Sequence, residues 1–188
     1  MKSRTIRQSM NLTKECDCMK KLIALVLVLV CVLEFAGCSA KIYKGTDELM
    51  GRARKEILIS EADTIDMQYA GMCGVDNKAI AWFISGNEYQ SHYYLPLEIE
   101  IKENRAEYIF IHTHKPMMDR ADNVAIVNWN QGYAFLINNP EIATVQMTLQ
   151  NGDIVEEIIQ KEMIPYTFYV PFIPSEYIFI DVEGNEVE

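Results

Sequence analysis

Short runs of residues that alternate between apolar and polar constrain the fold of this chain more than any other feature. From residue 63 onward such runs follow one another, and turn-forming residues separate them. A period of two places successive side chains on opposite faces of a β-strand. Asn151-Gly152 and Gly86-Asn87 supply residues typical of tight hairpins. The predicted strands cover approximately residues 65–70, 79–85, 89–101, 106–113, 124–128, 133–137, 143–149, 154–159, 166–170 and 177–181.

Short strands joined by short turns predict a mainly β domain, and more specifically an antiparallel β-sandwich. One short amphipathic helix is expected before them, over residues 46–57. Thr46 is its candidate N-cap, and Leu49 and Ala53 lie on its apolar face. Because no linker or repeat interrupts the chain after this helix, residues 46–188 are predicted to form a single domain.

The N-terminal segment has the organisation of a secretion signal. Lys20 and Lys21 precede an uncharged apolar stretch, residues 22–33. A helix of that length extends only ~18 Å, whereas the hydrocarbon core of a bilayer is ~30 Å thick. A basic start, a short apolar stretch and small residues after it are typical of a cleaved signal peptide. We therefore predict a signal peptide over residues 1–37, with Met19 as an alternative natural start.

The end of this segment, Ala36-Gly37-Cys38, resembles the lipobox of bacterial lipoproteins. The resemblance implies cleavage before Cys38 and a diacylglycerol thioether on its sulfur. It also implies that the protein is anchored in the cell membrane by this lipid, with its domain on the extracytoplasmic face. Residues 38–45 would then form a lipidated tether. The alternative is a signal anchor in which the cysteine is incidental.

The C-terminal end of the chain resembles the last strand of bacterial immunoglobulin-like domains. The residues that carry the resemblance are Tyr177, Asp181, Gly184 and Asn185. It implies an immunoglobulin-like form of the sandwich. Since that fold hosts many functions, the resemblance implies no specific ligand.

The charge of the chain excludes one class of partner. Residues 1–37 hold six of the 17 Lys and Arg and three of the 27 Asp and Glu. The rest of the chain therefore carries 11 basic and 24 acidic residues, a net charge of −13. Nucleic acids and anionic lipid headgroups are bound by basic surfaces. We expect no nucleic-acid partner, and membrane association only through the N-terminal lipid.

Candidate metal ligands occur near the end of one predicted strand. His112 and His114 are two residues apart, which would place both imidazoles on the same face as Phe110. His92 would be the third ligand of a zinc site, as an exported metal-dependent hydrolase requires. The alternative is a pair of solvated histidines at a strand end.

The remaining cysteine chemistry does not point to catalysis. If Cys38 carries lipid, the mature domain keeps only Cys73, which lies in a predicted turn and is expected to be a small buried apolar residue. No glycine-flanked nucleophilic serine and no phosphate-binding glycine loop occurs in the sequence. These features favour a non-enzymatic protein without a cofactor.

Candidate ligand-binding residues lie in the segment 89–95. Alternation there assigns Tyr94, His92 and Gln90 to the exposed face and the more apolar residues to the core. An exposed aromatic ring beside hydrogen-bonding groups is typical of surfaces that recognise a glycan or a protein. The sequence thus favours a binding or accessory module of the cell envelope. A metal-dependent hydrolase and an envelope inhibitor or immunity-type protein stay open as alternatives.

Overall fold

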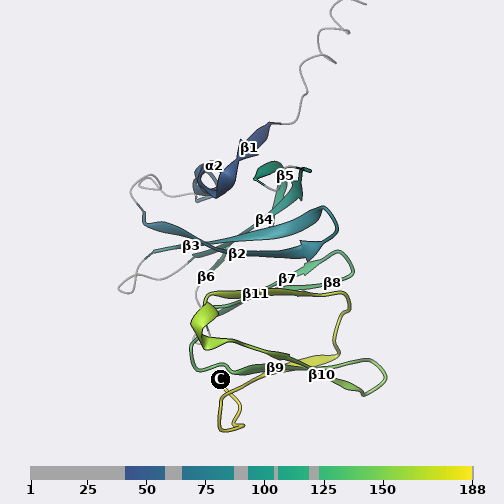
Figure 1. Cartoon of the computed structure of the whole chain (residues 1–188). Coiled ribbons are helices and arrows are strands. Elements are labelled where there is room, and N and C mark those ends of the chain that lie inside the picture. Colours follow the sequence, from purple (N-terminus) through teal and green to yellow (C-terminus); the bar gives the residue numbers. More distant parts are fainter. Residues whose placement is uncertain (1–40, 58–64, 87–92, 104–105, 119–122, 188) are drawn as a thin grey trace, which may run out of the picture. The chain divides into compact units, whose positions relative to one another are not determined.

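The computed structural model describes residues 41–57, 65–86, 93–103, 106–118 and 123–187 (Figure 1). Within these residues the chain is mainly β, its strands pair antiparallel, and one short α-helix, α2 (Gly45–Arg54), lies near the start. The prediction of a mainly β, antiparallel fold with one N-terminal helix is confirmed. Among the same residues, no helix has the length and apolar character needed to cross a membrane. The predicted signal peptide and Cys38 lie outside the described residues.

The first sheet is the largest of three. Its members are β1 (Ile42–Lys44), β2 (Met67–Val75), β3 (Lys78–Ser85), β4 (Tyr93–Ile101), β5 (Glu107–Thr113) and β6 (Met117–Met118). The strands lie in the order β1-β5-β4-β3-β2, and β6 pairs with β4. Strands β2, β3, β4 and β5 thus follow one another as a meander. Strand β1, which precedes them in the chain, pairs with β5 at the edge of the sheet.

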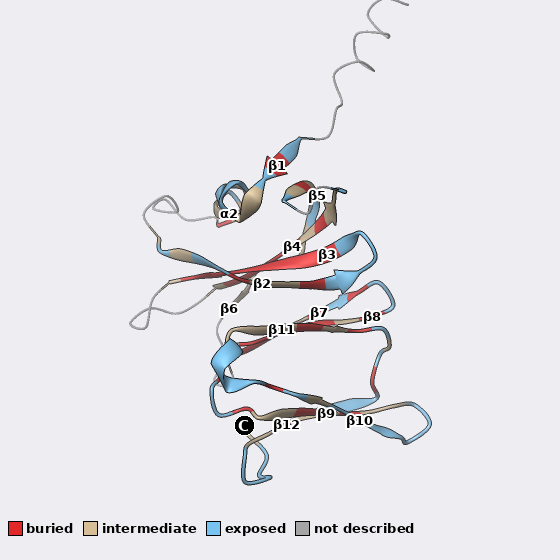
Figure 2. Cartoon of the chain, in the orientation of Figure 1, coloured by how far each residue is buried: buried red, intermediate tan, exposed pale blue. Residues whose placement is uncertain are grey.

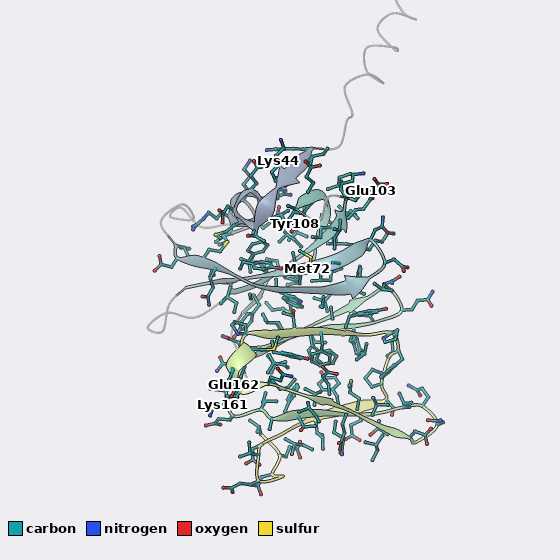
Figure 3. The ribbon with its side chains drawn as sticks, viewed as in Figure 1. Lys44, Met72, Glu103, Tyr108, Lys161 and Glu162 are labelled. Atoms are coloured by element: carbon teal, nitrogen blue, oxygen red, sulfur yellow. The ribbon has the colours of Figure 1, made fainter. Side chains whose placement is uncertain are left out.

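Two further sheets complete the fold. The second consists of β7 (Val124–Trp129), β8 (Gly132–Ile137) and β11 (Tyr166–Val170), in the order β11-β8-β7. The third consists of β9 (Thr144–Thr148), β10 (Ile154–Ile158) and β12 (Glu176–Ile180), in the order β10-β9-β12. A short 3-10 helix, η2 (Lys161–Met163), connects β10 to β11; Lys161 and Glu162 of this turn are labelled in Figure 3.

The apolar side chains form three clusters, each between two successive layers. Figure 2 marks the buried residues of these layers in red. The first cluster joins α2 to the first sheet, and Tyr108 and Met72 in Figure 3 lie in or against it. The second joins the first sheet to the second sheet. The third joins the second sheet to the third, where the rings of Phe135 and Phe168 stack at 4.6 Å. Each layer therefore stabilises the next by burying apolar surface.

Strand β3 shows why its sequence lacks a polar face. Ala81 and Phe83 point into the cluster beneath α2, while Ile80 and Trp82 point into the cluster shared with the second sheet. All four side chains are fully buried. A strand covered on both faces requires a continuous apolar run instead of an alternating one.

The start of the fold differs from the sequence prediction. Residues Ile42–Lys44, which the sequence assigns to the tether, form β1 and pair with β5 in the register Tyr43↔Tyr108. Helix α2 begins at Gly45 with Lys44 as its N-cap, so the prediction that Thr46 is the N-cap is wrong. The carboxylate of Glu48 accepts a hydrogen bond from the backbone N–H of Lys44 at 2.8 Å. The helix therefore has no side-chain N-cap bond, and the Glu48 carboxylate binds the N–H of the N-cap residue itself, as the acid of a capping box does.

Candidate functional site

Only some of the predicted site residues can be located in the structure. Cys38, Gln90 and His92 lie outside the described residues. Tyr94, His112 and His114 lie within them, on or next to strands of the first sheet. The structure therefore shows the environment of these three residues. It does not describe the complete predicted ligand-binding site, which includes Gln90 and His92, or the complete predicted zinc site, which includes His92.

Tyr94 lies in the core, so the prediction that it is exposed is wrong. Its side chain is 0% exposed and belongs to the cluster between the first and second sheets. It lies opposite Ile84 in the β3–β4 register, whereas the neighbouring Tyr93 is half-buried. The sequence pattern distinguishes two faces of β4, but it does not show that both are covered by another layer. A buried Tyr94 cannot touch a ligand at the surface.

The histidine pair lies on the opposite face of the sheet from the one predicted. Glu98 pairs with His112, but Ile99 pairs with Phe110, which leaves Ile111 as an extra residue in β5. A bulge of this kind reverses the alternation of side chains beyond it. Phe110 packs against the cluster beneath α2, and His112 lies on the other face, with Glu98. The prediction that the histidines share a face with Phe110 is therefore wrong.

The two imidazoles and Glu98 form a small polar group. The rings of His112 and His114 meet edge to face at 5.1 Å, and Nε2 of His114 lies 3.4 Å from Oε2 of Glu98. That Nε2 is buried and has no hydrogen-bond partner among the described residues. Burial lowers the pKa of His114 and the neighbouring His112 lowers it further, while Glu98 opposes both effects. His114 is consequently neutral at pH 7.

The described residues do not complete a zinc site by themselves. Within the described part of the chain, no three His, Cys, Asp or Glu side chains converge as a metal site would require. A catalytic zinc needs three protein ligands. The third ligand proposed from the sequence, His92, lies outside the described residues.

Cys73 lies in β2 and is buried, with 9% of its surface exposed. Burial raises the pKa of its thiol to about 12, against weaker opposing effects of the Trp82 side chain and the Phe135 backbone. The thiolate is the nucleophilic form of cysteine. A thiol that stays protonated at neutral pH has the packing role that the sequence predicted, although it lies in a strand instead of a turn.

The third sheet presents a surface that the sequence did not predict. Its inner face, with Val145, Met147 and Phe179, packs on the second sheet. Its other face, here called the outer face, is formed by Thr144, Gln146, Thr148, Ile154, Glu156, Ile158, Glu176, Ile178 and Ile180. Figure 2 shows β10 as largely exposed.

Four isoleucines are the unusual component of the outer face. Ile154 is 60% exposed and Ile158 is 72% exposed, and Ile178 and Ile180 are half-buried. Single exposed apolar residues are common, but a sheet face that gathers several of them is typical of an interaction site. The sequence contained a signal for it: Ile154-Val155-Glu156-Glu157-Ile158 has apolar residues on both faces and no consistent polar face.

Comparison of the chain with known protein families, with curated proteins and with solved structures gave no match.

Proposed function

We propose that the chain is a lipoprotein of the bacterial cell envelope, anchored through Cys38, whose extracytoplasmic domain is a non-enzymatic binding or accessory module. The observation that carries the binding role is the outer face of the third sheet, with its four isoleucines. The basic and apolar N-terminal segment before Ala36-Gly37-Cys38 supports the anchor. The partner is an envelope protein or glycan.

Two observations favour binding over catalysis. The high pKa of the Cys73 thiol keeps it protonated, so it is a poor nucleophile. His112 and His114 have a single carboxylate neighbour, Glu98, among the described residues, and they lie on the first sheet, whereas the exposed apolar surface lies on the third. The residues that could take part in catalysis therefore lie in the first sheet, whereas the surface suited to a ligand lies on the third sheet.

We further propose that the second and third sheets form a β-sandwich of the immunoglobulin-like class, with β12 as its last strand. The apolar cluster that these two sheets share supports it. The C-terminal motif is supported by its local geometry: the Asp181 carboxylate accepts hydrogen bonds from the backbone N–H groups of Glu183 and Asn185, both at 2.8 Å. A hydrogen bond from the Asn185 side chain, together with these backbone bonds, lowers the pKa of Asp181. The motif thus encodes a tight turn after β12, in which Gly184 has φ +87°.

Lipidation is tested by substituting the acceptor. In the full-length chain expressed in a bacterium, Cys38→Ala should abolish incorporation of labelled fatty acid and leave an uncleaved precursor, because the thioether cannot form. Metabolic labelling and the electrophoretic mobility of the protein measure both effects. Cys31→Ala, a change within the apolar stretch, is the matched control and should label like the parent. Equal labelling of Cys38→Ala would overturn the anchor.

The binding role is tested by photo-crosslinking in living cells. A photoreactive amino acid at Thr148, on the central strand of the outer face, should give a discrete crosslinked species of higher mass, because an envelope partner covers this position. The same amino acid at Lys55, an exposed residue at the end of α2, should give none. Equal crosslinking at both positions, or none at Thr148, would contradict the assignment of the outer face as a binding surface.

A further inference from the structure

We propose that β10 is an acceptor strand: an extended, basic segment of an envelope protein pairs antiparallel with its open edge and so adds a fourth strand to the third sheet. This inference rests on the proposed binding function and names the chemical class of the partner. Four observations carry it, namely the direction of the backbone groups of β10, the exposure of its isoleucines, its uncompensated charge, and its poor fit to a second copy of itself.

The hydrogen bonds at the ends of β10 fix which backbone groups point outward. Leu149 donates its N–H to the carbonyl of Asp153, and Ile159 donates to Ala143, both at 2.8 Å. Within an antiparallel pair, residues bonded to the partner strand alternate with residues whose N–H and C=O point away. The odd-numbered residues of β10 therefore bond to β9. The backbone groups of Ile154, Glu156 and Ile158 point toward the open edge.

This edge lacks most of the features that usually protect a free strand. Proteins blunt such edges with proline, charged side chains, especially lysine, or a bulge, or cover them with another segment. The charged residues of β10 are Glu156 and Glu157, which repel an acidic strand but attract a basic one. Strand β10 contains neither proline nor lysine, and its pairing with β9 is regular over all five residues. Within the described residues, β9 is the only strand with which β10 pairs. The edge can therefore accept another strand, as in recognition by β-augmentation.

The charge of β10 defines the partner. Glu156 accepts a hydrogen bond from Nε2 of Gln146 at 3.0 Å, and Glu157 accepts one from the hydroxyl of Tyr166 at 2.7 Å. Both donors are neutral, and the bond to Glu157 raises the pKa of Tyr166 to about 12, so the phenol stays protonated. No ion pair among the described residues neutralises either carboxylate. Two adjacent negative charges are thus available to lysine or arginine side chains.

A second copy of the chain does not fit this edge. When two β10 strands pair antiparallel so that Ile154 faces Ile158, the two Glu156 side chains lie directly opposite each other. Like charges in that position are destabilising. The complementary strand instead carries, from its N-terminus, residues that are apolar, basic, basic, apolar and apolar, opposite residues 158, 157, 156, 155 and 154.

The test uses two fluorescent peptides of identical length and apolar content. Their central sequences are Val-Lys-Lys-Val-Val and Val-Glu-Glu-Val-Val, each flanked by threonines. The full-length protein in detergent should bind the basic peptide at least tenfold more tightly than the acidic one, by fluorescence anisotropy. This preference should weaken as salt concentration rises, because exposed charges are screened. Equal affinity for the two peptides would overturn the proposal.

Three variants at position 156 separate backbone pairing from charge. Glu156→Gln removes the negative charge and keeps the backbone N–H, so any further loss of binding in Glu156→Pro comes from the backbone. Glu156→Pro removes an outward N–H that β9 does not use, and prolines are tolerated on edge strands with that geometry. It should reduce binding of the basic peptide at least tenfold while the thermal unfolding midpoint stays close to that of the parent. Glu156→Lys should weaken binding of the basic peptide and strengthen binding of the acidic peptide. If Glu156→Pro binds normally, the peptide does not pair with β10.

Amide hydrogen exchange gives a readout specific to strand addition. On binding the basic peptide, the amides of residues 154, 156 and 158 should exchange at least tenfold more slowly, while those of 155 and 157, already bonded to β9, should change little. Protection of neither set would overturn the proposal, as would a β10-dependent dimer in sedimentation. Crosslinking at Thr148 without peptide binding would reject strand addition and leave the binding module standing. Peptide binding without crosslinking at Thr148 would show that the outer face is not where the partner binds in cells.

Discussion

Tyr94→Ala should reduce the free energy of unfolding by about 3–5 kcal/mol, the usual cost of removing a fully buried large aromatic side chain. Tyr94 is fully buried between the first two sheets, so its loss leaves a cavity that both layers line. Urea unfolding followed by circular dichroism measures the change. Tyr93→Ala, at the half-buried neighbouring position, is the matched control and should cost less than half as much.

The opposite result would restore the binding role that the sequence suggested for this residue. If Tyr94→Ala unfolds at the same urea concentration as the parent but loses partner crosslinking, Tyr94 is a surface contact. A large loss of stability with crosslinking from Thr148 retained in the folded fraction is the outcome that the buried position requires.

Gly132→Ala should reduce the free energy of unfolding by about 3 kcal/mol or more. This is at or above the upper end of the usual range for overpacking. Gly132 begins β8 directly after the hairpin turn at Asn130 and Gln131, both of which have positive φ. A methyl group at this position would overlap the carbonyl oxygen of Val170 on the adjacent β11. Because that oxygen belongs to the backbone of a paired strand, β8 and β11 would have to separate.

Gly51→Ala is the matched control, because Gly51 lies in α2 and a methyl group added there would have no neighbouring atom within 4 Å. It should stabilise the fold by about 0.5–1 kcal/mol, since alanine loses less conformational entropy in a helix than glycine does. The same urea experiment compares the two variants. A Gly132→Ala protein as stable as Gly51→Ala would show that β8 and β11 are not as close as described.

Strand positions could be predicted from the sequence because they depend on local information. Alternation marks β2, and the hairpin residues Asn151-Gly152 separate β9 from β10 as expected. The strands that the sequence does not reveal, β1 and β6, have three and two residues. They are too short to show a period, and their positions depend on partners far along the chain.

The candidate site could not be predicted because it depends on which faces other layers cover. The expected positions of Tyr94 and the histidine pair rest on the period of two alone. A covering layer buries the first, and a single extra residue in β5 moves the second to the other side of the sheet. The apolar residues on both faces of β10 are compatible with an exposed Ile158, but they do not establish its exposure, because an apolar residue in a strand is normally assigned to the core. Which face of a strand is covered depends on how the sheets stack, and this depends on the whole chain.

The pairing of β1 with β5 has a consequence for the order of folding. Ile42 pairs with Ile109, across a sequence separation that contains the whole β2–β4 meander. Closing so long a loop is entropically unfavourable until the intervening hairpins have shortened it. We therefore expect the β2–β5 meander to form first, and β1 to join its edge together with α2 in a late step. As the chain is synthesised, the residues of β1 and α2 would emerge first but be among the last to acquire their native contacts, and until then the apolar surface of Leu97 and Phe83 would be open to chaperones.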